Sequence, residues 1–483
     1  MKTSFVQKKD LSELKKSVAV LILSEEEVKN TQLEYIKTTK EFFGFEGKSG
    51  EAKIVFDKQK PIVIVGIGAQ NKIDKLALQK CGSAVVAFLN AQKIADATVY
   101  FESDNEEDDL CNIAFGAILQ SYRFNKYFVD KLQDKEFKVS SLNFAVKEVK
   151  KAKKQFEELE ILANNILFAR DLVSEPANIL NPESYAEICK KLTKDGLKVE
   201  ILGEKEMQKL GMNSLLAVGQ GSSKESKLVV LKWNGGKRSD KPLAFVGKGV
   251  TFDTGGISIK PSANMEDMKS DMGGSAVVVG LLKNLAQRKA KINAVGVVGL
   301  VENMPSGDAQ RPGDVVTSMS GQTIEVINTD AEGRMVLADA LHYTNTKFKP
   351  ELIVDLATLT GAIIVCLADI YAGLFSNDDN LANDLIKSGE NTGEKLWRMP
   401  IGEDYDKMIN SDIADMKNVG SGRGAGSTTA AQFLKRFIGE TKWAHLDIAG
   451  VALKGKGDAF AIKGATGFGV NLLNDLVKKY EAK

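Results

Sequence analysis

Short apolar runs alternate with amphipathic stretches over the first 140 residues of the chain. The runs Val18–Leu23 and Pro61–Gly66 are rich in β-branched residues, as buried strands are, whereas Ile73–Leu89 has the three-to-four spacing of a helix. This βαβ-like order predicts a self-contained α/β domain. Its acidic segment Glu102–Asp109 is interpreted as a solvated turn, and we find no chemistry in this domain.

A long helical pattern follows this domain. Between Lys147 and Val173, apolar residues recur at every third or fourth position, which predicts a single connecting helix. We interpret its basic start, Lys147–Lys154, as a solvated helix face rather than a nucleic-acid contact. Pro176 and Pro182 then mark the entry to a second domain.

The rest of the chain alternates buried-looking strands with helices. Candidate strands lie at 228–233, 243–246, 292–300 and 352–357, and candidate helices at 274–285 and 335–343. Short apolar runs separated by helical patterns predict a mixed, mainly parallel sheet covered by helices on both faces. We therefore expect an α/β fold with a smaller N-terminal α/β domain at 1–145, a connecting helix at 146–174 and a larger C-terminal domain at 175–483.

Composition narrows the class of protein further. The chain is 43% hydrophobic and 27% charged, which is ordinary for a globular protein. Its 65 Lys and Arg residues balance 64 Asp and Glu residues, so no overall field favours nucleic acid or an anionic membrane. The four cysteines form no CxxC pair, and no apolar run approaches the roughly 20 residues that span a bilayer. We expect a cytoplasmic protein without a membrane partner.

Charged residues gather where predicted strands give way to helices. The segment 247–260 follows the strand Leu243–Val246, which places its charged residues in loops at the carboxyl end of that strand. Asp271 precedes the helix that begins at Gly274, and 328–334 ends one apolar run and opens the next helix. Ligands bind at such points in α/β folds. The resulting set of four acids and three cations is Asp253, Asp271, Asp330, Glu332, Lys248, Lys260 and Arg334.

Each acid alone has an ordinary structural explanation. Asp253 suits a turn, and Asp330 suits a helix N-cap. As a group, however, converging carboxylates would repel one another unless cations lay between them. Two divalent ions about 3.5–4 Å apart, sharing bridging carboxylates, would meet this need and could hold a nucleophilic water and a polarised carbonyl. An oxygen-rich ligand set suits Mn²⁺, Mg²⁺ or Zn²⁺.

Two other catalytic arrangements fit less well. Phe252–Gly255 resembles the catalytic turn of aspartic proteases, but the chain holds no second copy of it. The only histidines are His342 and His445, so neither an HExxH nor a three-histidine zinc site can be built, and no GxSxG elbow is present near a plausible strand end. We interpret both histidines as structural.

Several segments resemble the signature sequences of the leucyl aminopeptidase (cytosol aminopeptidase) family, bacterial type. The resemblance covers nearly everything after residue 165, whereas the first 150 residues show no motif that we can align. It implies a metallopeptidase domain that releases N-terminal amino acids from peptides, leucine preferred within a broad specificity, in a homohexamer formed from two trimers. The segments are Val246–Pro261, Met268–Gly274, Asn328–Arg334, Ala169–Val173, Asp355–Gly361, Ser411–Asn418 and Trp443–Gly450.

The resemblance also implies individual roles. Lys260 would stabilise the oxyanion, and Arg334 would hold a bicarbonate that relays a proton. One metal ion would be bound by Asp253, Asp330 and Glu332, and a second by Lys248, Asp253, Asp271 and Glu332. The wall of the first side-chain pocket would be formed by Met268, Thr358, Gly361, Ala449 and Ala452.

Two functions of other classes stay open. Some bacterial members of this family also bind DNA, which makes a DNA-binding regulator an alternative. The near-zero net charge weakens it, and Lys147–Lys154 is its only support. A catalytically inactive scaffold would predict loss of the acids and cations, yet every one of those positions is occupied.

Overall fold

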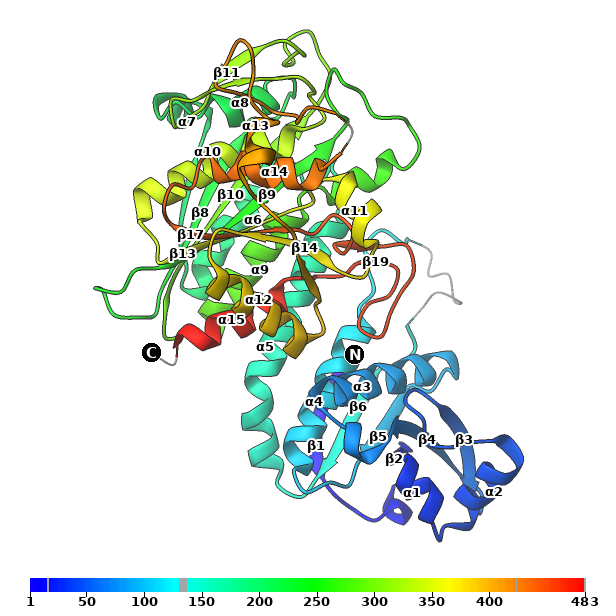
Figure 1. Cartoon of the computed structure of the whole chain (residues 1–483). Helices are drawn as coiled ribbons and strands as arrows, with labels where there is room; N and C mark the ends of the chain where they lie inside the picture. The colour runs from blue at the N-terminus through cyan, green and yellow to red at the C-terminus, as the bar shows by residue number, and fades with distance from the viewer. Residues whose placement is uncertain (15–16, 130–136, 423, 482–483) are drawn as a thin grey trace. The chain divides into compact units, whose positions relative to one another are not determined.

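The computed structural model describes residues 1–14, 17–129, 137–422 and 424–481. They form two compact units, Met1–Asn164 with Lys456–Lys463, and Asn165–Gly455 with Gly464–Lys483. Both units combine helices with a central sheet (Figure 1). The helix expected between Lys147 and Val173 is α5 (Val149–Ser174). Among the described residues, no helix is long and apolar enough to cross a membrane.

The N-terminal unit is built on a six-stranded sheet with the order β1-β6-β5-β2-β4-β3. All neighbouring strands are parallel except the hairpin of β3 and β4. Its two longest helices before α5 pack closely, since a Cβ on Gly82 would lie 1.9 Å from the carbonyl oxygen of Ile113. The elements are β1 (Lys2–Gln7), β2 (Val18–Ser24), α1 (Glu25–Asn30), α2 (Glu34–Phe43), β3 (Ala52–Asp57), β4 (Lys60–Gly68), α3 (Lys75–Ala91), β5 (Asp96–Tyr100), α4 (Glu106–Ser121) and β6 (Ser141–Val146).

The acidic segment of this unit differs from its interpretation as a solvated turn. Glu106 and Glu107 belong to the first turn of α4 and are only 2% and 7% exposed. Lys8 lies 3.0 Å from Glu106, and Lys151 lies 3.2 Å from Glu107. A helix N-terminus favours negative charge, and buried acids are tolerated when cations pair with them. The solvated-turn interpretation is therefore wrong for these two residues.

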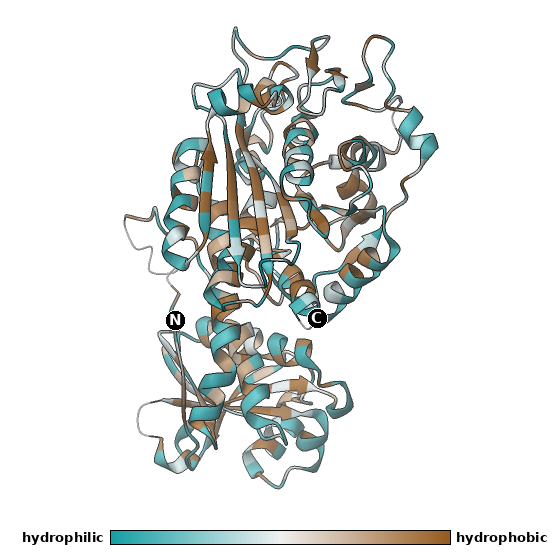
Figure 2. Cartoon of the chain, turned by 90° about the vertical axis from the view of Figure 1, so that its left-hand side faces the viewer, coloured by the Kyte–Doolittle hydropathy of each residue, from teal (hydrophilic) through white to brown (hydrophobic). Residues whose placement is uncertain are grey.

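The C-terminal unit is built on an eight-stranded mixed sheet with the order β15-β14-β17-β13-β9-β10-β8-β7. The four central strands, β17, β13, β9 and β10, run parallel to one another. They carry many of the apolar residues of the sheet (brown in Figure 2). The strands are β7 (Lys198–Leu202), β8 (Lys227–Asn234), β9 (Leu243–Asp253), β10 (Asn293–Asn303), β13 (Leu352–Ala357), β14 (Ala372–Ser376), β15 (Leu396–Arg398) and β17 (Lys442–Asp447).

Helices cover both faces of this sheet, so the predicted α/β architecture is confirmed (Figure 1). A Cβ on Gly247 of β9 would lie 2.6 Å from Cα of Ser275 in α9, and one on Gly299 of β10 would lie 2.6 Å from Val336 in α10. The small residues let the helices approach closely. The helices are α6 (Pro182–Lys191), α7 (Glu204–Lys209), α8 (Asn213–Gly219), α9 (Gly273–Gln287), α10 (Glu332–Phe348), α11 (Gly361–Leu367), α12 (Asp379–Thr392), α13 (Glu403–Lys407), α14 (Gly426–Lys435) and α15 (Val470–Glu481).

Strand β9 is longer than its apolar run suggested. It extends from Leu243 to Asp253, so Lys248 lies within the strand and Asp253 is its last residue. The expectation that both lie in a following loop is therefore wrong. The glycines around Lys248 suggested a loop, but in a buried central strand they serve close contact: a Cβ on Gly249 would lie 2.5 Å from the carbonyl oxygen of Gly299.

Candidate active site

Lys248 is buried at the centre of the candidate site. Its Nζ lies 2.7 Å from Oδ1 of Asp271 and 2.7 Å from Oε1 of Glu332. It also donates a hydrogen bond of 2.9 Å to the carbonyl oxygen of Thr358. Burial alone would lower the pKa of Lys248, but the attraction of Asp271 and Glu332 outweighs it and raises this pKa. In this arrangement Lys248 joins three segments that follow three different strands.

Asp253 ends β9 and is held by a sharp turn. Its Oδ1 accepts hydrogen bonds from the backbone N–H of Gly255 at 2.8 Å and from the side-chain amide of Asn303 at 2.7 Å. Gly255 has a φ of 86°, a conformation that glycine adopts without strain. Lys260 returns across this turn, and its Nζ lies 2.8 Å from Oδ2 of Asp253 and also pairs with Asp330. Asp253, which the sequence suggested to be a turn residue, therefore also forms an ion pair with Lys260.

Asp330 and Glu332 enter the site at the start of α10. The N-cap of this helix is Ala331, so the alternative that Asp330 caps the helix is wrong. The first turn of α10 fits tightly against β9, because a Cβ on Gly333 would lie 2.5 Å from Cε of Lys248. Glu332 begins the helix three residues earlier than the apolar pattern suggested. Its carboxylate is buried and faces Lys248.

Carboxylates from separate segments converge closely enough to hold a metal ion. One carboxylate oxygen each of Asp253, Asp330 and Glu332 lies within 4.8 Å of the others. Oδ2 of Asp271 is buried without a hydrogen-bond partner among the described residues. Burial, together with the repulsion of neighbouring acids, raises the pKa of Asp253 and of Asp271 despite the nearby lysines. A buried excess of acids with an unpartnered oxygen fits a divalent cation.

Arg334 lies in the first turn of α10 and is also buried. Its Nη1 donates to the carbonyl oxygen of Asn418 at 2.7 Å, and its Nε has no hydrogen-bond partner within the described ranges. Burial lowers the pKa of Arg334 to about 10, although Glu332 and Asp447 act in the opposite direction. A buried guanidinium with an unused donor fits a small anion such as bicarbonate.

The residues expected to form the pocket wall lie on three segments. A Cβ on Gly273 would lie 3.4 Å from Cβ of Ala452 and 3.5 Å from Cγ2 of Thr358, so both side chains lie beside the start of α9. Met268 lies on a 3-10 helix at Met265–Ser270, Gly361 begins α11, and Ala449 follows β17.

Two asparagines that hold the acidic loops were missed by sequence reasoning. Asn303, at the end of β10, bonds Asp253 and also donates to the carbonyl oxygen of Thr329 at 3.0 Å. Asn418 accepts from the backbone N–H of Ile327 at 2.8 Å and donates to the carbonyl oxygen of Asn328 at 2.7 Å. The available signals were the position of Asn303 just after an apolar strand and the place of Asn418 in the segment Ser411–Asn418.

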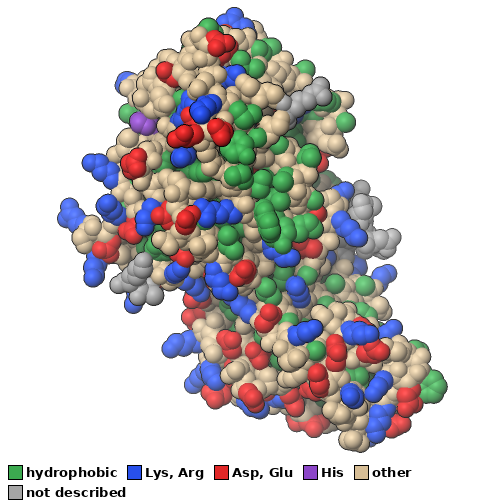
Figure 3. Space-filling view, viewed as in Figure 1, with side chains coloured by type: hydrophobic (Ala, Val, Ile, Leu, Met, Phe, Trp, Pro, Cys, Tyr) green, Lys and Arg blue, Asp and Glu red, His purple; other side chains and the backbone are tan. Residues whose placement is uncertain are grey.

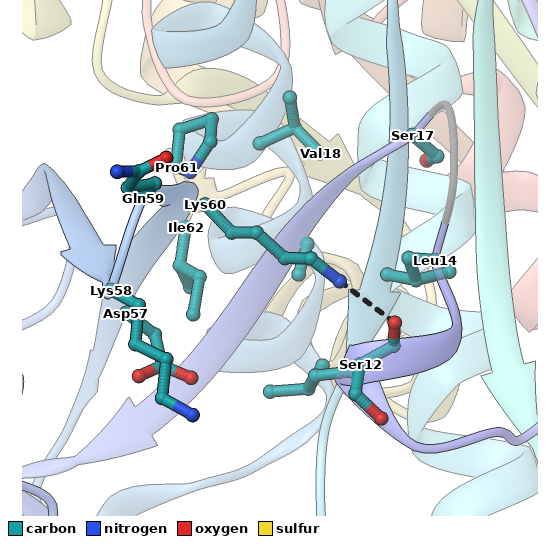
Figure 4. Close-up of a pocket in the computed structure, with 12 residues that line it drawn as sticks. Ser12, Leu14, Ser17, Val18, Asp57, Lys58, Gln59, Lys60, Pro61 and Ile62 are labelled. Carbon is teal, nitrogen blue, oxygen red and sulfur yellow. Dashed lines mark hydrogen bonds between the residues drawn. The ribbon is translucent and has the colours of Figure 1, made fainter.

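The N-terminal unit contains a separate hollow of about 620 Å³ (Figure 4). Across it, the amino group of Lys60 donates a hydrogen bond of 2.7 Å to the carbonyl oxygen of Ser12. Its charged lining residues are Asp57, Lys58 and Lys60. Residues 15–16, which connect Leu14 to Ser17 in the lining, lie outside the described residues. We assign no ligand to this hollow.

Comparisons with known proteins point to one family. Residues 167–474 match the catalytic domain of the cytosol aminopeptidase family, and residues 12–131 match its N-terminal domain. A probable cytosol aminopeptidase of Brucella melitensis is 54% identical over 441 residues, which are 90% of this chain and 91% of that protein. One of Ehrlichia ruminantium is 54% identical over 443 residues, covering 90% and 88% respectively.

Two solved structures have the same fold as this chain. The bottromycin maturation enzyme BotP in complex with Mn superposes with a TM-score of 0.86 at 30% identity, covering 97% of this chain and all of BotP (100%). A variant of tomato leucine aminopeptidase gives a TM-score of 0.86 at 32% identity, covering 99% of this chain and 96% of that one. The whole chain, including the N-terminal unit, therefore has counterparts of known structure.

Proposed function

The chain belongs to the cytosol aminopeptidase family and is an aminopeptidase, and we propose that it uses two divalent metal ions to release N-terminal residues from peptides, with leucine preferred. The observation that carries this proposal is the convergence of Asp253, Asp330 and Glu332 on a single point, with their oxygens within 4.8 Å of one another. Asp253 and Glu332 are buried and Asp330 is partly exposed, and the two lysines that pair with them, Lys248 and Lys260, do not offset all the charge of Asp253, Asp271, Asp330 and Glu332.

We propose the two ligand sets that the resemblance to the family implies, and the grouping of Asp253, Asp330 and Glu332 supports the first of them. We assign one ion to Asp253, Asp330 and Glu332, and a second to Lys248, Asp253, Asp271 and Glu332. Lys248 would bind as a neutral amine, because two adjacent dications would lower its pKa and replace its ion pairs with Asp271 and Glu332. When bound, two such ions supply a Lewis acid for the scissile carbonyl and lower the pKa of a bound water. The oxygen-rich set, and the Mn in the BotP complex, support Mn²⁺, with Zn²⁺ and Mg²⁺ as alternatives.

Two cations are assigned to the reaction itself. Lys260 is partly exposed and pairs with Asp253 and Asp330, so its ammonium group is aimed at the acids from the open side of the site. We propose that it polarises the scissile carbonyl and stabilises the oxyanion. Arg334 would hold a bicarbonate that accepts a proton, and the unused Nε donor of Arg334 supports this assignment.

The specificity is proposed to be broad. Thr358 and Ala452, which both lie beside the start of α9, present small groups, as do Gly361 and Ala449. Together with Met268 they would suit leucine or methionine side chains. Such a pocket distinguishes one methylene by only about 1–3 kcal/mol, so several N-terminal residues should be accepted.

We also propose a cytoplasmic homohexamer formed from two trimers. Exposed apolar side chains support association: Ile364 and Val365 on α11 are 46% and 90% exposed, and Ile370 is 56% exposed. Figure 3 shows hydrophobic side chains gathered on the face around α11. Patches of this kind often mark protein interfaces. Sedimentation of the purified chain as a species near six times its monomer mass of 52.4 kDa would support this assembly, and a monomer at micromolar concentration would contradict it.

The experiment for the proposed activity compares leucine anilide with N-acetyl-leucine anilide. The chain is assayed as purified, after removal of metal by a chelator, and after addition of Mn²⁺ or Zn²⁺. Cleavage of the free-amine substrate alone, lost with chelator and recovered with metal, is expected. Equal cleavage of both substrates, or indifference to metal, would contradict the mechanism.

No observation favours the DNA-binding alternative. Lys147 lies 3.5 Å from Glu106 and Lys151 lies 3.2 Å from Glu107, so two lysines of the basic run are paired with acids of α4. That pairing leaves less positive charge for phosphate contacts. A gel shift at low salt that disappears on substitution of the remaining lysines would reinstate this function.

A further inference from the structure

Asp447 is a fully buried carboxylate that the proposed mechanism does not use. It is the last residue of β17, and its surface exposure is 0%. Its Oδ1 accepts from the backbone N–H groups of Leu359 at 3.1 Å and Ala449 at 3.3 Å, and its Oδ2 accepts from the hydroxyl of Thr360 at 2.6 Å. A buried carboxylate is costly unless donors surround it, and here the donors belong to loops.

The donors come from the loops that leave two neighbouring strands. Ala357, the last residue of β13, pairs with Asp447 in the sheet, so both loops begin side by side. Thr360 also caps α11, because its Oγ1 accepts from the backbone N–H of Ile363 at 3.2 Å. The same hydroxyl lies 3.0 Å from that of Ser427 at the start of α14. One carboxylate thus connects both loops with the starts of two helices.

The loop after β13 reaches the proposed metal ligands directly. The hydroxyl of Thr358 donates to Oδ1 of Asp271 at 2.8 Å, and the carbonyl oxygen of Thr358 accepts from Lys248 at 2.9 Å. Thr358 is adjacent to Leu359, whose N–H is held by Asp447. A shift of this loop would therefore move the partners of Asp271 and Lys248. It would also move Gly361 in the proposed pocket wall.

We propose that Asp447 is a positioning residue that fixes the loop Thr358–Gly361, and through Thr358 sets the geometry of Asp271 and Lys248 and the shape of the first side-chain pocket. Behind it lies a buried dyad: Nδ1 of His445 is 2.6 Å from Oδ1 of Asp355, whose Oδ2 accepts from Nε1 of Trp443 at 2.6 Å. Asp355 is therefore the carboxylate partner of His445, whereas Asp447 accepts its hydrogen bonds from the loops after β13 and β17. This inference rests on the proposed function, because both the Mn²⁺ affinity and the kinetic readout depend on the proposed metal site.

The test compares two variants of Thr360, whose hydroxyl donates to Asp447: Thr360→Val and Thr360→Ser. Valine keeps the shape but removes the hydroxyl that bonds Asp447, whereas serine keeps it. We expect T360V to bind Mn²⁺ about 10 to 100-fold more weakly by calorimetry, the usual range for loss of a group that orients metal ligands. T360S should bind Mn²⁺ as the unmodified chain does. Normal Mn²⁺ affinity in T360V would overturn the proposal.

A second pair separates positioning from a general loss of packing. Asp447→Asn is compared with Asp339→Asn, because Asp339 is also buried and also accepts two backbone bonds, from Leu215 at 2.9 Å and Met319 at 2.8 Å, on a different segment. With Mn²⁺ saturating, D447N should change the ratio of kcat/KM for leucine over alanine anilide at least tenfold, and D339N should leave it unchanged. Equal ratios in all three proteins, or the same change in D339N, would overturn the proposal.

Failure of the proposed function would be recognised separately. If the unmodified chain binds Mn²⁺ but cleaves no anilide, the aminopeptidase mechanism fails and the calorimetric comparison of T360V with T360S still decides the role of the loop. If D447N does not fold by circular dichroism, the Thr360 pair carries the decision alone, since its valine variant is close to isosteric.

Discussion

Gly333 lies directly against Lys248, and a Cβ at this position would be 2.5 Å from Cε and 2.7 Å from Nζ of the lysine. Gly333→Ala is therefore expected to displace Lys248 from Asp271 and Glu332. Overpacking of this kind costs about 1–3 kcal/mol. We expect a lower melting temperature and weaker Mn²⁺ binding, measured by calorimetry. Gly307→Ala is the control, because its Cβ would meet nothing within 4 Å; equal behaviour of the two variants would contradict this packing.

Glu332 is expected to be needed for metal binding rather than for folding. Glu332→Gln keeps the size of the side chain but removes the charge that faces Lys248 at 2.7 Å. As the proposed bridging ligand, its loss should disrupt both ions and abolish metal-dependent turnover. Metal content by mass spectrometry and turnover of leucine anilide check this, with the exposed Glu403→Gln as control. Full activity at normal metal content in E332Q would refute the ligand assignment.

The fold was largely predictable because its central strands are continuous apolar runs. β13 was placed at 352–357, where the structure has it, since it is buried along its whole length. β9 was predicted too short, because Gly247 and Gly249 are typical of loops in isolation and are explained only by the close approach of neighbouring backbone. The buried acids of α4 were missed for a related reason: Lys8, the partner of Glu106, is 98 residues away in the sequence.

The site was predictable where its residues carry their own local signal. Asp253, Asp330 and Glu332 lie at the ends of strands and the start of a helix, and the structure brings them together. Asp447 also ends a strand, but its role lies in hydrogen bonds to Leu359 and Thr360, 88 and 87 positions away, which the sequence does not show. A single sequence shows the ligands of a site more readily than the residues that orient them.

Lys260→Ala should separate turnover from metal binding. Lys260 pairs with Asp253 and Asp330 but is not assigned to a metal. Its removal should leave Mn²⁺ binding largely intact and lower kcat about 10² to 10³-fold, the usual effect of losing an oxyanion donor. Calorimetry and steady-state kinetics on the same preparation check both parts. Loss of Mn²⁺ from K260A would instead make Lys260 a metal ligand.

Asp339 should make the stability of the chain depend on pH between about 4 and 7. Burial raises its pKa from 3.8 to about 7, although the backbone N–H groups of Met319 and Leu215 act in the opposite direction. The folded chain therefore keeps a proton that the unfolded chain releases above pH 3.8. The free energy that Asp339 contributes to stability is greatest below pH 3.8. It falls by at most about 1.4 kcal/mol per pH unit as pH rises, and it levels off above about pH 8.

Asp339→Asn removes this titration, so it isolates the contribution of the carboxyl group. The difference in unfolding free energy between the unmodified chain and D339N should shift against the unmodified chain as pH rises from 5 to 7, and should level off above about pH 8, one unit above the pKa of the folded state. Denaturant unfolding at four pH values, with metal removed by chelator, measures it. A difference that is independent of pH across the whole range would show that Asp339 titrates at its ordinary pKa, with the backbone donors outweighing burial.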